Sequence, residues 1–119
     1  METVINKPTM KDKKVIMAED NIRVLNTIDI LYIESQAHYL CIYMIEESIK
    51  IRSKLNEFLE GIEENFLRVH QSFAVNMAYI KRLEHAEIEL TNGNRIPISR
   101  SKHKEAKEKL INYLEKQKL

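Results

Sequence analysis

Three strand-like segments follow one another, with no helical segment between them, in the stretch Ile28-Asp-Ile-Leu-Tyr-Ile-Glu-Ser-Gln-Ala-His-Tyr-Leu-Cys-Ile-Tyr-Met-Ile-Glu-Glu-Ser-Ile-Lys-Ile-Arg52. Residues 28–33 and 49–52 alternate, which is the pattern of strands with one buried face. Residues 38–45 are rich in β-branched and aromatic residues, as in a strand that is covered on both faces. Strands joined directly by short polar turns favour antiparallel sheets and disfavour an all-parallel α/β fold.

The segments on either side of this stretch predict a hairpin before it and a helix after it. Residues 15–17 and 22–25 flank a polar turn and are expected to pair as a hairpin. After Arg52 the apolar period becomes 3.6, which predicts one helical stripe formed by Leu55, Phe58, Leu59, Ile62 and Phe66. Ser53 stands at the N-cap position of this helix, and Gly61 is placed to end its regular part.

Short strands resume after the helix. Residues 67–70, 79–83 and 86–91 are expected to be strands, with Ala86, Ile88 and Leu90 pointing inward, and residues 71–76 a turn. Asn92-Gly93 predicts a type I′ hairpin turn into a strand whose Pro97 belongs at a sheet edge. A second helix follows, with one apolar face made of Ala106, Leu110, Tyr113 and Leu114. The pattern therefore predicts a mainly β fold of about nine strands with two short helices.

Length and composition fit one small soluble domain. The chain has 119 residues, of which 44% are hydrophobic and 31% charged. We expect residues 1–13 to be a leader or linker and residues 14–119 to form the domain. The longest apolar run, Tyr39–Ile45, is too short to insert into a membrane, and no secretory signal precedes the first strand. A single cysteine, Cys41, excludes an internal disulfide, so a cytoplasmic location is expected.

The sequence offers few groups for catalysis or metal binding. Two glycines, Gly61 and Gly93, cannot build a glycine-rich phosphate loop. The four histidines, His38, His70, His85 and His103, lack the spacing of zinc ligands. Cys41 lies in an apolar run, a poor setting for a nucleophilic thiolate. We therefore expect no enzymatic activity, no cofactor and no metal.

The net charge of +1 hides an uneven distribution along the chain. Residues 1–14 carry +2, residues 15–99 carry −5 and residues 100–119 carry +4. Basic ends on a nearly neutral protein can contact a polyanion through a limited footprint. Solvated, lysine-rich tails remain the alternative interpretation.

Polar residues gather in three segments between the apolar strands, namely residues 34–38, 68–76 and 92–101. Loops that are held by a rigid β scaffold are common places for recognition residues. Glutamine and asparagine can pair bidentately with adenine, arginine with guanine, and serine with phosphate. These segments are candidate recognition loops.

In these segments the sequence resembles the LytTR-type DNA-binding domain of bacterial transcription regulators, including response regulators of two-component systems. The matching pieces are Ile30–Ser35 with His38 and Tyr39, residues 51–55, Phe66–Asn76 with Ile80, Leu90–Gly93, and Ile96–Ser101. Their order and spacing agree from about Lys14 to the final helix. The resemblance implies elongated antiparallel β-sheets, and not a helix-turn-helix.

The resemblance also implies a function. It implies sequence-specific binding to double-stranded DNA, with loops that read successive major grooves of direct repeats in promoters. Two copies are expected on the DNA, which bends toward each domain. Many members carry an amino-terminal receiver domain, for which this chain has no room. We therefore expect either a stand-alone regulator or the carboxy-terminal part of a larger one, with a receiver domain or another regulatory partner outside this chain as the second case.

Three residues match positions that approach bases in the family: His38, Gln71 and Arg100. Gln71 replaces the more usual arginine or asparagine and remains able to read adenine. Ser101 and Lys102 are candidate phosphate partners. The alternatives are strand-end packing for His38, bonding within a buried turn for Gln71, and a plain surface position for Arg100.

Two further expectations complete the interpretation. His70 and Asn76 are expected to be structural, because apolar residues surround them in the sequence. The alternative function is a protein-interaction module that has kept the fold without binding DNA.

Overall fold

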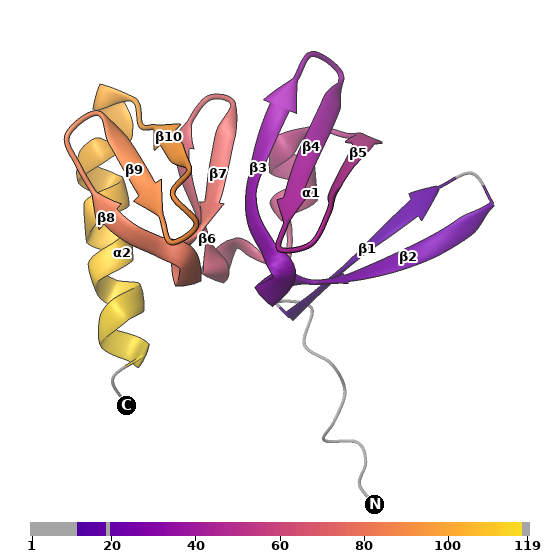
Figure 1. The fold of residues 1–119 in the computed structure, drawn as a ribbon, viewed down its shortest axis with the longest axis horizontal. Coiled ribbons are helices and arrows are strands. Elements are labelled where there is room, and N and C mark those ends of the chain that lie inside the picture. Colours follow the sequence, from indigo (N-terminus) through magenta and orange to yellow (C-terminus); the bar gives the residue numbers. More distant parts are fainter. Residues whose placement is uncertain (1–11, 19, 118–119) are drawn as a thin grey trace, which may run out of the picture.

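A computed structural model describes residues 12–18 and 20–117 of the chain (Figure 1). These residues form ten strands, two α-helices and short 3₁₀ turns. The strands are β1 (Lys13–Ala18), β2 (Asn21–Asn26), β3 (Ile30–Gln36), β4 (Tyr39–Met44), β5 (Ser48–Arg52), β6 (Phe66–His70), β7 (Phe73–Asn76), β8 (Ile80–Leu83), β9 (Glu87–Leu90) and β10 (Arg95–Pro97). The helices are α1 (Leu55–Leu59) and α2 (His103–Gln117). The predicted class, mainly β with antiparallel sheets and two helices, is confirmed.

The strands form three sheets. The main sheet has the order β5-β4-β3-β7-β6, a smaller sheet has the order β10-β9-β8, and β1 pairs only with β2. The predicted hairpin is confirmed, with Val15 opposite Val24 in its register. Residues 73–76, which the sequence assigned to a turn, are strand β7, so the turn itself contains only Gln71 and Ser72. Much of the predicted leader, residues 1–11, lies outside the described residues.

Two hydrophobic clusters lie on opposite sides of β6 and β7. In the first cluster, α1 and the β1–β2 hairpin pack on the main sheet, and Phe66 and Ala74 belong to it. In the second, α2 and the smaller sheet pack on Leu67, Val69 and Val75. Successive side chains of a strand point to opposite faces, so β6 and β7 contribute to both clusters. This arrangement fixes the β6–β7 turn between two packed layers.

Strand β4 is covered less completely than the sequence suggested. Leu40 and Ile42 are fully buried, whereas Cys41 and Tyr43 are half-buried and Tyr39 is 39% exposed. The expectation of two covered faces was wrong for β4, because only the face toward α1 meets a core. Tyr43 stacks on Tyr32 on the other face, with ring centroids 4.5 Å apart.

The helical stripe predicted from Leu55 to Phe66 is helical only at its beginning, and the helix ends close to Gly61, where the sequence suggested that its regular part stops. Helix α1 ends at Leu59, Gly61 adopts φ +88°, and Phe66 begins β6. Ile62 and Phe66 still enter the first cluster, but from a turn and a strand. The apolar spacing thus predicted correctly which side chains are buried, but it predicted the helical backbone correctly only as far as Leu59. The N-cap is Lys54, and the Ser53 hydroxyl lies 3.4 Å from the Lys54 carbonyl instead of capping an N–H.

The β9–β10 hairpin turns differently from the prediction. Gly93 has φ +95°, but Asn92 does not have a positive φ, so the turn is not type I′. The Gly93 N–H donates to the Leu90 carbonyl and the Leu90 N–H to the Asn94 carbonyl, both at 2.9 Å. The Asn92 side chain accepts from the Asn94 N–H at 2.9 Å. This is the three-residue alternative, a turn closed by a left-handed glycine. Pro97 ends the edge strand β10, as expected.

Helix α2 is tied to the start of β6. The Lys109 ammonium donates to the Glu63 and Phe66 carbonyls at 2.9 and 2.8 Å, and burial lowers the pKa of Lys109. Ala106 and Leu110 are buried, whereas Leu114 is 49% exposed. The inward orientation expected for Leu114 and Ala86 was wrong, because both side chains are exposed to solvent.

Asn76 joins the end of β7 to the beginning of β3. Its side-chain amide donates to the Thr27 and Ile30 carbonyls at 3.1 and 2.9 Å, and its oxygen accepts from the Ala78 N–H at 2.9 Å. With 2% of its surface exposed, it satisfies buried backbone groups, which confirms its structural role. Among the described residues, no helix combines the length and apolar character of a membrane span.

Candidate nucleic-acid interface

Three connections that lie far apart in the sequence come together at one end of the molecule. They are the β3–β4 turn, the β6–β7 turn and the segment from β10 to α2, all at the upper end in Figure 1. The Ser35 N–H donates to the Ser72 carbonyl at 2.8 Å, which joins the first connection to the second. The Ser99 N–H donates to the Val69 carbonyl at 2.8 Å, which joins the third to the second. Backbone hydrogen bonds therefore hold the three connections side by side. We call these connections, residues 37–38, 71–72 and 98–102, the recognition edge.

The β3–β4 turn presents His38. Gln36 pairs with Tyr39, so Ala37 and His38 form the two-residue turn. Ala37 has φ +55° and is the one non-glycine residue with positive φ in the part of the chain that the structure describes. This conformation costs about 1–2 kcal/mol for an L-residue, and such strain is tolerated where the surrounding sheet enforces it. The His38 side chain is exposed, so it is not packed at the strand end.

The β6–β7 turn presents Gln71 on a backbone that Arg68 and His70 hold in place. The Arg68 guanidinium donates to the His70 carbonyl at 3.3 Å, to the Gln71 carbonyl at 2.9 Å and to the Asn56 side-chain oxygen. His70 Nδ1 accepts from the Ser72 N–H at 3.1 Å. The Gln71 side chain itself is exposed. The side-chain hydrogen bonds that hold the turn are thus made by Arg68 and His70, the neighbours of Gln71.

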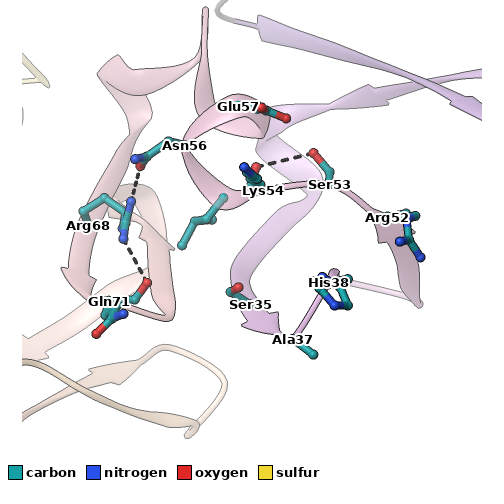
Figure 2. A pocket seen from close by; sticks show the side chains of 11 residues that line it. Ser35, Ala37, His38, Arg52, Ser53, Lys54, Asn56, Glu57, Arg68 and Gln71 are labelled. Atoms are coloured by element: carbon teal, nitrogen blue, oxygen red, sulfur yellow. Dashed lines mark hydrogen bonds between the residues drawn. The ribbon is translucent and has the colours of Figure 1, made fainter.

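Arg68 is a positioning residue for this turn. Burial lowers the pKa of Arg68, which is partly removed from solvent. Its donors point to protein acceptors, including Asn56 on α1 (Figure 2). Arginine remains protonated at neutral pH even so, and its planar fork can bridge several acceptors at once. The guanidinium therefore links the β6–β7 turn to α1.

The third connection presents Arg100 and Ser101. Arg100–Lys102 form a 3₁₀ turn that leads into α2, and the Lys102 N–H donates to the Ser99 carbonyl at 3.0 Å. Arg100 and Ser101 are exposed, and Lys102 is half-buried. At the start of α2, His103 Nε2 lies 3.2 Å from the Glu84 carbonyl.

A hollow of about 630 Å³ lies between the first two turns. His38 and Gln71 line it from opposite sides (Figure 2). The remaining lining residues are Ser35, Ala37, Arg52, Ser53, Lys54, Leu55, Asn56, Glu57 and Arg68. The structure thus brings two of the sequence-predicted residues to one hollow, while Arg100, Ser101 and Lys102 lie outside its lining.

The sequence did not single out Arg52, Lys54, Asn56 and Arg68 as site residues. Arg68 stands at the beginning of one polar segment, where its role could have been suspected. Arg52 ends an alternating strand and Lys54 comes two residues later, so both look like ordinary solvent-facing charges. Asn56 carried no signal, because its contact with Arg68 depends on the tertiary fold.

Comparison with known proteins gives consistent results. Residues 20–111 match the family model described as the LytTr DNA-binding domain. Over 92% of its length, the chain is 29% identical to the sensory transduction protein LytT of Enterococcus faecalis and 27% identical to that of Bacillus subtilis. It spans about half, 48%, of each of these relatives.

A solved structure shares the fold. It is described as the LytTr DNA-binding domain of a putative methyl-accepting/DNA response regulator from Bacillus cereus. The match has a TM-score of 0.67 and 24% identity, and it covers 85% of this chain and 97% of that one. The family match over most of the chain, together with this shared fold, shows that the chain belongs to the LytTr DNA-binding domain family.

Proposed function

We propose that this chain is the sequence-specific, double-stranded DNA-binding part of a bacterial transcription regulator and has no enzymatic activity. Membership of a DNA-binding domain family supports the binding of DNA. The observation that supports sequence-specific binding is the arrangement of the recognition edge. Three exposed polar side chains, His38, Gln71 and Arg100, stand on three connections that backbone hydrogen bonds join side by side.

Each of the three side chains has the chemistry to contact the edge of a base. Arginine can pair bidentately with guanine, and glutamine with adenine. Histidine can donate or accept at a base edge. Ser101 and Lys102, beside Arg100, would hold phosphate groups and so fix the register of the domain on the duplex.

The expected binding mode uses successive major grooves of direct-repeat sites, with one domain on each repeat. The described residues measure 46 × 39 × 24 Å, and one turn of B-DNA is about 34 Å long. A single domain is therefore large enough to meet two grooves. A rigid edge meets both only when the duplex bends toward it, which is why we include DNA bending and two copies in the proposal.

The proposed regulator is larger than this chain. Its two curated relatives are about twice as long, and each is called a sensory transduction protein. We propose a receiver domain or another regulatory partner, which would place this domain in a cytoplasmic two-component system.

A protein-interaction module remains the second candidate function, and one surface favours it. Val15, Met17, Ile22 and Val24 are between 44% and 78% exposed, and they form two cross-strand pairs on one face of the β1–β2 hairpin. An exposed apolar face of this kind suits a protein partner. This surface lies on a different element from the recognition edge, and in the alternative function it would be the binding surface in place of that edge.

Salt-dependent binding separates the two functions. We expect the chain to bind a fluorescent random-sequence duplex at about 50 mM salt and to lose affinity steeply by about 200 mM, since phosphate contacts release counterions. Fluorescence anisotropy measures this directly. Absence of binding at the lower salt concentration would contradict the DNA-binding function and favour the protein-interaction module.

Arg68→Met is expected to reduce discrimination between DNA sequences while leaving non-specific binding nearly unchanged. The substitution removes the donors that hold the His70 and Gln71 carbonyls, so Gln71 loses its fixed position. The loss is bounded by one bidentate base contact, about 1–3 kcal/mol, which corresponds to roughly 5- to 150-fold in relative affinity. Competition binding between selected and shuffled duplexes measures it.

Asn56→Ala serves as the graded control for this prediction. It removes only the contact between Arg68 and α1, so a smaller loss of discrimination is expected. Arg68→Lys keeps the charge but lacks the planar fork, and it should resemble Arg68→Met. Unchanged discrimination in a folded Arg68→Met variant would show that Arg68 does not position Gln71.

A further inference from the structure

The arginines of this chain differ in what their guanidinium groups contact. Three of them form ion pairs: Arg23 with Glu47, Arg82 with Glu84, and Arg95 with Glu84, Glu87 and Glu89. Arg68 donates to neutral acceptors within the fold. Within residues 12–18 and 20–117, only Arg52 and Arg100 have neither an ion pair nor a side-chain hydrogen bond. Arg100 already belongs to the recognition edge, so Arg52 is the unexplained one.

Arg52 lies beside the His38 turn. It is the last residue of β5, and it pairs in the sheet with Tyr39, the residue after His38. Its guanidinium lies over the Tyr39 ring, 5.7 Å from the centroid, and the Lys50 ammonium lies 5.1 Å from the same centroid. Such stacking limits the freedom of the Arg52 side chain while its hydrogen-bond donors remain available. Arg52 is thus exposed, charged and partly preorganised.

The charges around the hollow favour an anion. Arg52, Lys54 and Arg68 line it together with one carboxylate, that of Glu57. This excess of positive charge falls within residues 15–99, whose total charge is −5. A local positive site on an otherwise acidic segment attracts polyanions to that place rather than to the surface in general. The hollow is therefore electrostatically suited to a phosphate-bearing ligand.

We propose that Arg52 and Lys54 bind phosphodiester groups of one DNA strand that passes through the hollow between the β3–β4 and β6–β7 turns. This inference rests on the proposed function and deepens it. The two residues belong to the end of β5 and the N-cap of α1, which form a wall of the hollow, whereas His38 and Gln71 stand on the turns themselves (Figure 2). Arginine grips a phosphate with its fork, and lysine adds a point charge.

The test compares the salt dependence of DNA binding for the full chain and its variants Arg52→Gln, Lys54→Gln and the double substitution. A random-sequence duplex and a duplex selected by the wild-type chain are the two probes. Each phosphate contact contributes about 0.9 to the slope of log affinity against log salt. Each single variant should therefore lose about 0.9 of slope and about fivefold in affinity near 0.15 M salt, and the double variant about twenty-five-fold.

Matched variants separate a phosphate contact from a general effect of charge. Arg23→Gln makes the same charge change at an arginine of the β1–β2 hairpin, outside the lining of the hollow, that is paired with Glu47, and it should leave the slope unchanged. Arg52→Lys keeps the charge and should keep the slope. Because Arg52 and Lys54 are exposed, thermal unfolding of all variants should match the wild type.

Three results would overturn the assignment, and they point to different causes. If wild type binds DNA and the Arg52 and Lys54 variants keep its slope, the phosphate contacts do not exist, while the proposed function stands. If Arg52→Gln alters the selected motif at one base pair and leaves random-duplex binding intact, Arg52 reads a base instead. If the wild-type chain binds neither probe, the proposed function fails together with this inference.

Discussion

Replacing Gln71 and Arg100 together with alanine is expected to abolish the preference for a target duplex over a shuffled one. Each side chain is exposed on its own connection of the recognition edge. A good bidentate base contact contributes about 1–3 kcal/mol of discrimination, so two independent contacts contribute about 2–6 kcal/mol. The relative affinity for the target should therefore fall by a factor of about thirty to more than ten thousand.

The single variants assign each contact. Arg100→Ala should remove the preference at one guanine, and Gln71→Ala should remove it at a different base pair. Arg82→Ala is the matched control, because this exposed arginine is paired with Glu84 on the smaller sheet. If the double variant discriminates as well as wild type while remaining folded, these residues do not read the sequence.

The second large effect concerns stability and involves no DNA. Asn76→Ala is expected to lower the free energy of unfolding by about 3 kcal/mol, because the Thr27 and Ile30 carbonyls and the Ala78 N–H each lose a buried partner. The total free energy of unfolding of a small domain is only about 5–15 kcal/mol. The melting temperature should fall by roughly 10–20 °C, measured by circular dichroism.

Asn112→Ala is the control for this prediction. Asn112 is exposed on α2, so its replacement should change stability by no more than about 0.5 kcal/mol. A loss below about 1 kcal/mol for Asn76→Ala would contradict the structural role of its side chain. Urea denaturation gives the free energies that the comparison needs.

Local patterns in the sequence were sufficient to predict several parts of the fold. The β1–β2 hairpin follows from two alternating segments around a polar turn, and its register pairs Val15 with Val24. The apolar spacing alone predicts a longer helix than α1, and the reason is physical. Ile62 and Phe66 continue the helical spacing because both are buried in the same cluster, yet Gly61 ends the helix before them. Spacing of apolar residues reports which side chains are buried more reliably than it reports backbone conformation.

The candidate site could be predicted only in part. The family resemblance proposed His38, Gln71 and Arg100 as base contacts, which stays a prediction, and the structure shows what holds their connections side by side. Those backbone bonds, from Ser35 to Ser72 and from Ser99 to Val69, join residues that are distant in sequence. Arg52 escaped notice because an alternating strand normally ends in solvated charges. Its lack of an acidic partner becomes visible only when the ion pairs of the other arginines are known.

The central claim is that the recognition edge reads DNA sequence. The most direct test is the selection of bound duplexes from a random pool by the wild-type chain and by Arg100→Ala in parallel, at moderate salt. We expect wild type to enrich a direct-repeat motif, and the variant to enrich the same motif with one base pair no longer specified. Enrichment of no motif by wild type, or of an identical motif by both proteins, would contradict the claim.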